Sequence, residues 1–432
     1  MTRSVFVGVL LAASAVSQAQ VTFTEYPIPA PSSGPYSSTP GPDGNIWFTE
    51  HDRNNIGQIT PAGVITEFPV PTSSGTLEQI AAGPDGNLWF TDFSGQTIWR
   101  MTTAGVTTAF ATGGNPEGIT AGPDGNMWFT ERSGNRVARI TMSGVITEFL
   151  VPTTNCQPYG ITAGPDGNIW FTEVTDTVHQ IGRMTLSGVF TEFLIPTASS
   201  APYAIVPGPD GNLWFTESAP LANSIGRITP AGDITEFPLP TPGAAPVEIT
   251  KGPDGNMWFT EHNGNNIGRI TLSGVISEFP VPTANSQPWA IRTGPDGNLW
   301  FTEISANQIG KGIITIAQSP YQALIQQPIN PDGTSLFNAS RGVIPVKFTL
   351  NMTGSATCQL PPATISLART SGATGAVDES VYLQAADNGS NFRISGCQYL
   401  YNLSASSLGS GGYRVDLTIN GAVVGSGVFG LK

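Results

Sequence analysis

The sequence predicts an all-β protein, a seven-bladed β-propeller followed by a smaller β domain. A ten-residue phrase, Gly-Pro-Asp-Gly-Asn followed by apolar-Trp-Phe-Thr-acid, occurs seven times at intervals of 39 to 44 residues. A period of about 40–50 residues with strand-like content is typical of propeller blades. The repeats show no helical periodicity of about 3.6 residues, and they end at about Ala317.

The first nineteen residues have the features of a secretory signal. Arg3 is the positive start, residues 5–16 are apolar, and residues 17–19 form a small-x-small cleavage site. The apolar stretch is too short to span a bilayer. We therefore expect residues 1–19 to be a signal peptide, and the mature protein to be secreted by a bacterium (extracellular or periplasmic) without a transmembrane segment.

Each repeat contains four short strand patterns separated by turns. In the fourth copy these patterns lie at 159–163, 169–173, 180–185 and 189–195. In the Gly-Pro-Asp-Gly-Asn turn, Pro sets φ at its own position and the second Gly accepts a positive φ. Four antiparallel strands with short connections make one blade, and the Trp-Phe pair of the second strand is expected to be buried.

The two ends of the repeat region predict a closed ring. The last repeat reaches its third strand pattern near residue 316 but has no fourth one. The missing pattern, Thr-Glu-Tyr-Pro, occurs at the mature N-terminus within residues 21–29. We expect this segment to be the outer strand of the seventh blade, so that residues 20–316 form a propeller without a large unpaired edge.

Residues 317–432 form a second predicted domain. Apolar and polar residues alternate in short runs, and Asn420-Gly421 is typical of a type I′ hairpin turn. This pattern predicts an immunoglobulin-like β-sandwich, and Cys358 and Cys397 could form a disulfide in an oxidising compartment. The stretch at 344–348 resembles the PxKF module of secreted bacterial proteins. Cys156, in the repeat region, is expected to be a free thiol.

Composition excludes several kinds of partner. The net charge is −13, and only 11% of residues are charged. Without a basic patch, nucleic acid and anionic lipid are not expected as partners. The sequence also contains no pair of residues with metal-ligand spacing, no nucleotide-binding glycine loop and no nucleophile motif. We expect a monomer.

Two sets of residues are expected to meet on one face, near the central channel. The first set is the acids that end the second strands: Glu50, Asp92, Glu131, Glu173, Glu217, Glu261 and Glu303. The second set follows the start of each inner strand: Tyr36, Glu78, Glu117, Tyr159, Tyr203, Val247 and Trp289. Aromatic walls with carboxylates could hold a small-molecule or peptide ligand, or a cation.

A structural alternative exists for the acids. Each third strand from the second blade onward carries a cation, and Glu131 could pair with Arg139 across its hairpin; the other cations are Arg100, Arg183, Arg227, Arg269 and Lys311. Among the three histidines, His51 and His262 directly follow second-strand acids. His262, beside Glu261, is a candidate catalytic residue.

The region from about residue 21 to 316 resembles the streptogramin B lyase (virginiamycin B lyase) family through its repeated GPDGNxWFTE, NxIGRIT and GxITEFPxPT phrases. The resemblance implies a propeller that opens a cyclic depsipeptide lactone by β-elimination with magnesium. That reaction needs a base to remove the proton α to a carbonyl and a cation to stabilise the enolate.

The resemblance also implies a histidine after the inner-strand Pro in late blades, and a second-strand Glu fourteen residues later. Glu261 and Glu303 match the Glu positions, but the histidine positions hold Val247 and Trp289. Tyr36 matches an aromatic residue expected in the first blade. Two functions stay open: a secreted binding or surface module without the lyase reaction, or a magnesium-assisted lyase that uses Glu303 (also the candidate metal ligand), Glu261 and His262.

Overall fold

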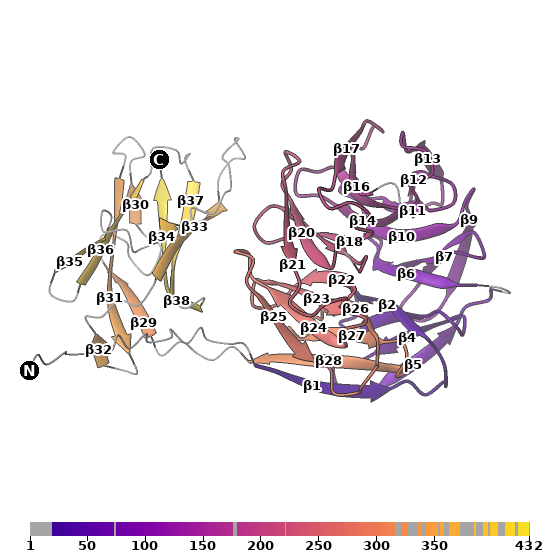
Figure 1. The fold of residues 1–432 in the computed structure, drawn as a ribbon, viewed down its shortest axis with the longest axis horizontal. Coiled ribbons are helices and arrows are strands. Elements are labelled where there is room, and N and C mark those ends of the chain that lie inside the picture. The colour runs from indigo at the N-terminus through magenta and orange to yellow at the C-terminus, as the bar shows by residue number, and fades with distance from the viewer. Residues whose placement is uncertain are drawn as a thin grey trace, which may run out of the picture. The chain divides into compact units, whose positions relative to one another are not determined.

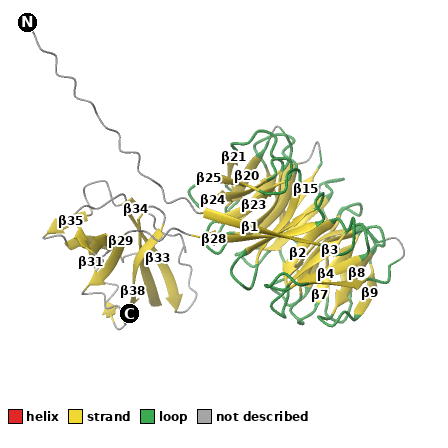
Figure 2. Ribbon diagram, turned by 90° about the horizontal axis from the view of Figure 1, so that it is seen from below, coloured by secondary structure: helices red, strands yellow, loops and turns green. Residues whose placement is uncertain are grey.

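The structure is a computed structural model that describes residues 20–315, apart from 73–74, 176–178 and 221, and most of the strands between 321 and 431. These residues form strands, turns and loops but no helix (Figure 2), so the described part has no helical segment able to cross a membrane. Its contacts separate a unit spanning Val21–Ile314 from one that contains Thr315–Lys432. The predicted signal peptide, residues 1–19, lies outside the described residues.

The first unit consists of seven four-stranded sheets, as predicted (Figure 1). The first strand of each blade lies beside the first strands of both neighbouring blades, which places these strands around the central axis. These inner strands are β2 (Pro35–Pro40), β6 (Leu77–Ala82), β10 (Pro116–Ala121), β14 (Pro158–Ala163), β18 (Pro202–Pro207), β22 (Pro246–Lys251) and β26 (Pro288–Thr293).

The remaining strands follow outward in each blade. The second strands are β3 (Ile46–Glu50), β7 (Leu88–Asp92), β11 (Met127–Glu131), β15 (Ile169–Val174), β19 (Leu213–Glu217), β23 (Met257–Glu261) and β27 (Leu299–Glu303). The third strands are β4 (Asn55–Ile59), β8 (Thr97–Met101), β12 (Arg136–Ile140), β16 (His179–Met184), β20 (Ser224–Ile228), β24 (Asn266–Ile270) and β28 (Gln308–Thr315). The outer strands are β5 (Ile65–Pro69), β9 (Thr107–Ala111), β13 (Ile146–Leu150), β17 (Phe190–Leu194), β21 (Ile234–Pro238), β25 (Ile276–Pro280) and β1 (Gln20–Pro27).

The N-terminal strand closes the ring. The seventh sheet has the order β1-β28-β27-β26, so the first strand of the chain covers the outer edge of the last blade. The amide of Ile28 then donates a hydrogen bond to the carbonyl of Asn307 at 3.0 Å. The predicted closure is confirmed, and it removes an edge that could pair with another chain.

The repeated phrase builds each blade through its aspartate and its tryptophan. In all seven blades the indole Nε1 of the Trp donates a hydrogen bond to the Asp four residues earlier, at 2.8–3.1 Å. The Trp is fully or almost fully buried and stacks on an aromatic ring of the outer strand, as Trp170 does on Phe193. The turn therefore satisfies the one polar group that burial of the indole would leave without a partner.

The threonine of the phrase joins neighbouring blades. Its hydroxyl donates to the backbone carbonyl of the second residue of the next inner strand, from Thr49 to Glu78 and onward to Thr302 and Tyr36. The same hydrogen bond thus occurs at all seven blade boundaries, including the one between the last blade and the first. It fixes the backbone of the residues that surround the end of the channel.

The second unit contains two five-stranded sheets. One consists of β29 (Tyr321–Gln326), β31 (Val343–Met352), β32 (Ser355–Thr357), β35 (Phe392–Ser395) and β36 (Gln398–Ser404). The other consists of β30 (Ser335–Phe337), β33 (Ala363–Ser371), β34 (Gln384–Ala385), β37 (Gly411–Ile419) and β38 (Ala422–Leu431).

Two features of this unit bear on its prediction. β37 and β38 pair antiparallel with Ile419 opposite Ala422, while the predicted turn residues Asn420 and Gly421 lie outside the described residues. Val346, Phe348 and Leu350 alternate as buried residues of β31. The immunoglobulin-like and PxKF assignments stay predictions, and Cys358 and Cys397 lie outside the described residues.

Candidate functional site

Seven residues surround one end of the channel, and we call this end the mouth. Each is the second residue of its inner strand: Tyr36, Glu78, Glu117, Tyr159, Tyr203, Val247 and Trp289. Because the inner strands are neighbours around the axis, the fold brings these residues together as the sequence predicted. They comprise four aromatic residues, two glutamates and one valine.

Three tyrosines form the centre of the aromatic group. The hydroxyl of Tyr36 lies 2.8 Å from that of Tyr159 and 2.8 Å from that of Tyr203, and Tyr159 and Tyr203 also share a short hydroxyl–hydroxyl contact. Burial raises the pKa of all three phenols well above the ordinary value. The mouth is therefore crossed by neutral hydroxyl groups that hydrogen bond to one another.

Trp289 packs against this cluster. Its ring centroid lies 4.8 Å from that of Tyr36 and 5.6 Å from that of Tyr203. On another side it meets His262 edge to face, with centroids 5.0 Å apart. Among the described residues, neither the indole Nε1 of Trp289 nor the Nδ1 of His262 has a hydrogen-bond partner. Burial lowers the pKa of His262 below its ordinary value, so the imidazole is neutral at pH 7.

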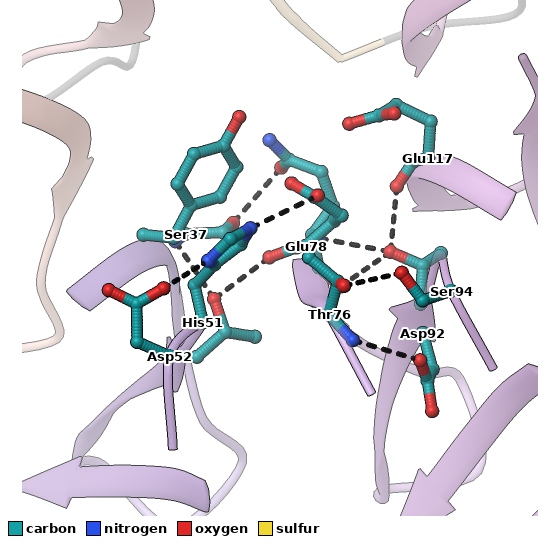
Figure 3. A network of polar contacts seen from close by, with 12 residues as sticks. Ser37, His51, Asp52, Thr76, Glu78, Asp92, Ser94 and Glu117 are labelled. Atoms are coloured by element: carbon teal, nitrogen blue, oxygen red, sulfur yellow. Dashed lines mark hydrogen bonds and ion pairs between the residues drawn. The ribbon is translucent and has the colours of Figure 1, made fainter. Parts of the chain in front are cut away.

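The two glutamates of the mouth each lie near a cation, and Figure 3 shows Glu78 with its neighbour His51. His51 Nδ1 is 2.8 Å from Asp52, and its Nε2 is 3.5 Å from Glu78. The hydrogen bond to Glu78 is the main cause of a His51 pKa raised to about 9, so this histidine is protonated at pH 7.

Glu117 is the second glutamate of the mouth, and its carboxyl lies 3.8 Å from Arg132. Burial, together with the charge of Glu78, raises its pKa to about 8. The guanidinium of Arg132 also lies over the ring of Tyr159, 5.5 Å from its centroid. Arg132 therefore links the carboxyl side of the mouth with the tyrosine cluster.

The acids that end the second strands do not join the mouth. Each is fully buried, and in six blades the charge of the outer-strand glutamate in the same blade acts on it: Glu67 on Glu50, Glu148 on Glu131, Glu192 on Glu173, Glu236 on Glu217, Glu278 on Glu261, and Glu25 on Glu303. Both sets lie at the same end of the blades, because the register places each acid opposite the first residue of the inner strand, as Glu131 is opposite Pro116. The buried carboxyls of the acids interact with the outer strands, as Glu131 does with Glu148.

Burial dominates the electrostatics of these acids. It raises the pKa of Glu50 and Glu303 to about 7, of Glu173 and Glu261 to about 8, and of Glu217 to about 9. The nearby outer-strand glutamate disfavours ionisation further. At pH 7, Glu173, Glu217 and Glu261 are therefore largely protonated, whereas Glu50 and Glu303 are about half protonated. All five are fully buried, so as placed they do not reach a substrate or a metal ion in the channel.

The predicted pair of Glu131 with Arg139 is not formed, and Glu131 instead lies 3.5 Å from Arg136, another cation of the same third strand. In the blade hairpin, Arg139 lies opposite Trp128, whereas Glu131 lies opposite Arg136 at the other end. Arg139 is 3.4 Å from the turn residue Asp124, and its guanidinium lies 5.5 Å from the centroid of the Trp128 ring. Arg100, Arg183, Arg269 and Lys311 likewise contact their turn aspartates and their tryptophans.

Magnesium does not fit Glu303 as the residue is placed. Mg²⁺ requires several oxygen ligands in a nearly octahedral arrangement. Glu303 is fully buried, and the charge that acts on it is that of one other carboxyl, Glu25. Within the described part of the chain, no three His, Cys, Asp or Glu side chains are placed to hold a metal ion.

Cys156 is a free thiol, as predicted, and it is buried. Its amide donates to Asn135 Oδ1 at 2.8 Å, as the amide of Ser286 does to Asn265 Oδ1 in the sixth blade. The alignment of the repeats predicts this equivalence of Cys156 and Ser286. Burial raises the pKa of the thiol above its ordinary value, so Cys156 is an inert core residue.

Two charged residues near the mouth were not predicted. These are Glu248 and Arg292, which lie deeper in the channel and form an ion pair of 2.6 Å. An alignment of the seven blades could have found them. At the Glu248 position the other blades have Ser37, Gln79, Gly118, Gly160, Ala204 and Ala290, and at the Arg292 position they have Thr39, Ala81, Thr120, Thr162, Val206 and Thr250.

Comparison with known proteins agrees with this architecture. A family model described as the virginiamycin B lyase family matches residues 15–149 and 111–336. A solved streptogramin B lyase structure is 37% identical, with a TM-score of 0.66, and the match covers 70% of this chain and 100% of that chain. A catalytically inactive histidine-to-alanine variant of Staphylococcus aureus virginiamycin B lyase, solved with quinupristin, is 39% identical, with a TM-score of 0.65 and coverage of 68% and 100%.

One similarity is local. Virginiamycin B lyase from Bacillus licheniformis is 50% identical over 46 residues, a stretch that covers 11% of this chain and 16% of that protein. This match spans much less than two thirds of the relative, in contrast to the two solved structures.

Proposed function

Since the chain belongs to the virginiamycin B lyase family, we propose that it is a secreted propeller of that family that binds a small-molecule or peptide ligand at its mouth without opening a lactone. The observation that carries this proposal is the packing of Trp289 against Tyr36, Tyr203 and His262. The family resemblance implies a histidine at this position and another at the position of Val247.

The chemistry of these positions supports binding without turnover. Neither an indole nor an isopropyl side chain accepts a proton, so neither can act as the base of a β-elimination. In a solved relative, replacing a histidine with alanine accompanies loss of activity. The second-strand acids Glu261 and Glu303 are fully buried, and burial raises their pKa to about 8 and about 7.

The mouth nevertheless has the composition of a recognition surface. Tyr36 and Trp289 present aromatic rings, while Glu78 and Glu117 lie on the neighbouring blades with His51 and Arg132. An amphipathic ligand could place an apolar part on the rings and a polar part on the charged groups. The second unit would then serve as a spacer or an attachment domain of the secreted protein.

The experiment is incubation of the full chain with quinupristin in buffer with magnesium or with EDTA. Elimination of the ester breaks the C–O bond and leaves a carboxylate and a double bond, so the linear product has the same mass as the substrate. It is therefore identified by its retention time and its fragmentation, with the Staphylococcus aureus lyase as positive control. We expect intact quinupristin in every arm, and a linear product would overturn the proposal.

A second candidate, a lyase that opens a cyclic depsipeptide lactone such as virginiamycin B, is favoured by one observation. His262 is neutral, and within the described residues its Nδ1 has no partner. It could accept the proton α to a carbonyl of a ligand seated on Trp289. Magnesium dependence belongs to this candidate as a proposal and has no ligand set among the residues described above.

Variants separate the two candidates. If a linear product forms, loss of product in His262→Gln but not in Glu303→Gln would assign His262 as the base. Loss in Glu303→Gln or Glu261→Gln, with normal folding, would assign the catalytic role to the buried carboxyl. If no product forms, calorimetric titration of quinupristin into the wild type and into Trp289→Ala tests binding alone. Heat that saturates in the wild type and weakens in Trp289→Ala supports the binding module.

A further inference from the structure

A cavity of about 410 Å³ extends along the central channel. Tyr159 and Tyr203 of the mouth line one part of it, so the tyrosine cluster separates it from the mouth. Its walls reach Pro40, Ala82 and Ala121, the last residues of three inner strands, which directly precede the Gly-Pro-Asp-Gly-Asn turns. The cavity therefore runs from the mouth toward the opposite end of the blades. Its size is typical of small-molecule sites, roughly 300–1,000 Å³.

Polar and apolar residues contribute about equally to the lining of this cavity. Successive residues of a strand point to opposite sides, and the isoleucines of the inner strands, such as Ile80, Ile161 and Ile205, pack in the cores between blades. The positions next to these isoleucines consequently face the channel. Four of them are threonines, namely Thr39, Thr120, Thr162 and Thr250, and all four line the cavity.

These threonines have hydrogen-bonding capacity to offer. Among the described residues, no protein partner is found for the hydroxyls of Thr39, Thr120, Thr162 and Thr250, whereas the threonines of the second strands are all bound to neighbouring blades. A hydroxyl can donate one hydrogen bond and accept others. Four of the seven blades thus present a hydroxyl at the cavity wall that can exchange hydrogen bonds with other hydroxyls.

One charged pair is built into the same wall. Arg292 Nη1 donates to Glu248 Oε2 at 2.6 Å and to the carbonyl of Ile291 at 2.7 Å. The other oxygen of Glu248 accepts from Gln79 Nε2 at 3.1 Å, and the amide oxygen of Gln79 accepts from the hydroxyl of Ser37 at 3.0 Å. Glu248 is 4% exposed, and Gln79 is also buried. This chain of hydrogen bonds holds the guanidinium at the cavity wall, where its remaining N–H groups can donate to a ligand.

From this arrangement we infer that the cavity is a binding site for a small uncharged polyhydroxylated ligand, of the size of a monosaccharide or a disaccharide. The carboxylate of Glu248 already neutralises Arg292, so an anion would be desolvated without a net charge to compensate it. Hydroxyl groups, in contrast, can accept from the free guanidinium N–H groups and exchange hydrogen bonds with the threonines. The protein's net charge of −13 also disfavours an anionic ligand.

This inference does not depend on what happens at the mouth. The experiment titrates D-glucose and maltose into the full chain, with binding followed by calorimetry and by saturation-transfer NMR. D-Gluconate and D-glucosamine serve as the anionic and cationic counterparts. We expect saturable binding of at least one of the two sugars and weaker binding of both charged compounds.

Three variants locate the site. Arg292→Met, which keeps the aliphatic stem, is expected to weaken sugar binding about tenfold because a charge-assisted hydrogen bond is lost. Since that variant leaves Glu248 without its partner, Thr120→Val/Thr250→Val is a second test that removes two hydroxyls at nearly constant volume. His262→Gln, at the mouth, is the matched control and should leave sugar binding unchanged.

Several outcomes would overturn the inference. One is the absence of saturable binding by both sugars, and another is tighter binding of gluconate than of glucose. Sugar affinity that is unchanged in the folded double threonine variant would also do so, because the threonine hydroxyls would then have no part in recognition. Loss of sugar binding in His262→Gln would place the sugar at the mouth instead.

Discussion

The indole of Trp289 covers the imidazole of His262 edge to face, with ring centroids 5.0 Å apart and an interplanar angle of 88°. Trp289 is the last member of the aromatic group at the mouth, and His262 is a loop residue that follows the end of β23. Their contact connects the sixth and seventh blades at the place where the family resemblance predicts catalytic histidines.

This contact predicts the protonation behaviour of His262. Burial lowers its pKa, so Trp289→Ala should expose the ring and raise the pKa toward the ordinary value of about 6.5. The measurement is an NMR titration of the histidine ring protons. His51, whose pKa is raised to about 9 by Glu78, is the internal control and should not move. An unchanged titration of His262 in the variant would show that Trp289 does not cause its burial.

The buried acids predict that stability falls at alkaline pH. A carboxyl whose pKa is raised on folding binds its proton more tightly in the folded protein than in the unfolded chain. This contribution is complete below the unfolded pKa of about 4.5 and is lost as the pH rises through the folded values, which are about 7 to 9 for Glu50, Glu303 and Glu217 among others.

The expected result is a melting temperature that decreases from about pH 5 to about pH 9.5. Glu217→Gln keeps the shape of the neutral side chain and should flatten part of this decrease, with a higher melting temperature than the wild type at the alkaline end. Asp233→Asn, an exposed turn variant in the same blade, is the control. A wild-type melting temperature that increases over this pH range would contradict the assignment.

The turn aspartates predict a large structural effect in one blade. Asp254 accepts from Trp258 Nε1 at 2.8 Å and from Arg269 Nε at 2.7 Å, and its side chain is 2% exposed. Asp254→Ala leaves a buried indole and a cation without an acceptor, which should cost about 3 kcal/mol of the free energy of unfolding.

Asp43 is the matched comparison for Asp254. It accepts from Trp47 Nε1 at 3.0 Å, but its third-strand neighbour is the neutral Gln58 rather than an arginine. We expect about 1 kcal/mol for Asp43→Ala, measured by the same denaturant titration. Equal losses in the two variants would mean that the arginine adds nothing to the turn.

The N-terminal strand predicts a defect when it is removed. Deleting residues 20–29 takes away β1, exposes the edge of β28, and removes Glu25, which accepts hydrogen bonds from the amide and the hydroxyl of Thr283 at 3.0 and 2.9 Å. The expected result is a lower melting temperature and association through the open edge, observed by size-exclusion chromatography. Glu25→Gln, which keeps the strand, should stay monomeric, and a monomeric deletion variant with unchanged melting temperature would contradict the role of β1.

Much of the fold could be predicted because each blade repeats the same turn and strand sequences. The Gly-Pro-Asp-Gly-Asn turn, the alternation of the strands and the copy number predicted seven four-stranded sheets, and the Thr-Glu-Tyr-Pro segment predicted the closing strand. The residues of the mouth were also predicted, because six blades have a Pro at the start of the inner strand and the mouth residue follows it, as Tyr36 and Trp289 do, while Glu78 occupies the same position after Leu77.

The direction in which the acids point could not be predicted. Glu131 and Arg139 lie on adjacent strands of one hairpin, yet register places Arg139 beside Trp128 and Asp124. The strand register and the position of the outer strand bring Glu148 close enough for its charge to act on Glu131. Neither the register nor the position of the outer strand can be read from the repeat period.

The sequence by itself determined the blades, their number, the closure of the ring and the residues that reach the mouth, since these depend on local turns and on a repeated period. Only the tertiary structure decided which side chains meet across blades: Trp289 with His262, His51 with Glu78, and Glu248 with Arg292 through the channel. Contacts of this kind join positions about 27 to 44 residues apart, and they arise when the ring closes and brings the inner strands around one axis. The same closure buries the second-strand acids and raises the pKa of the glutamates among them.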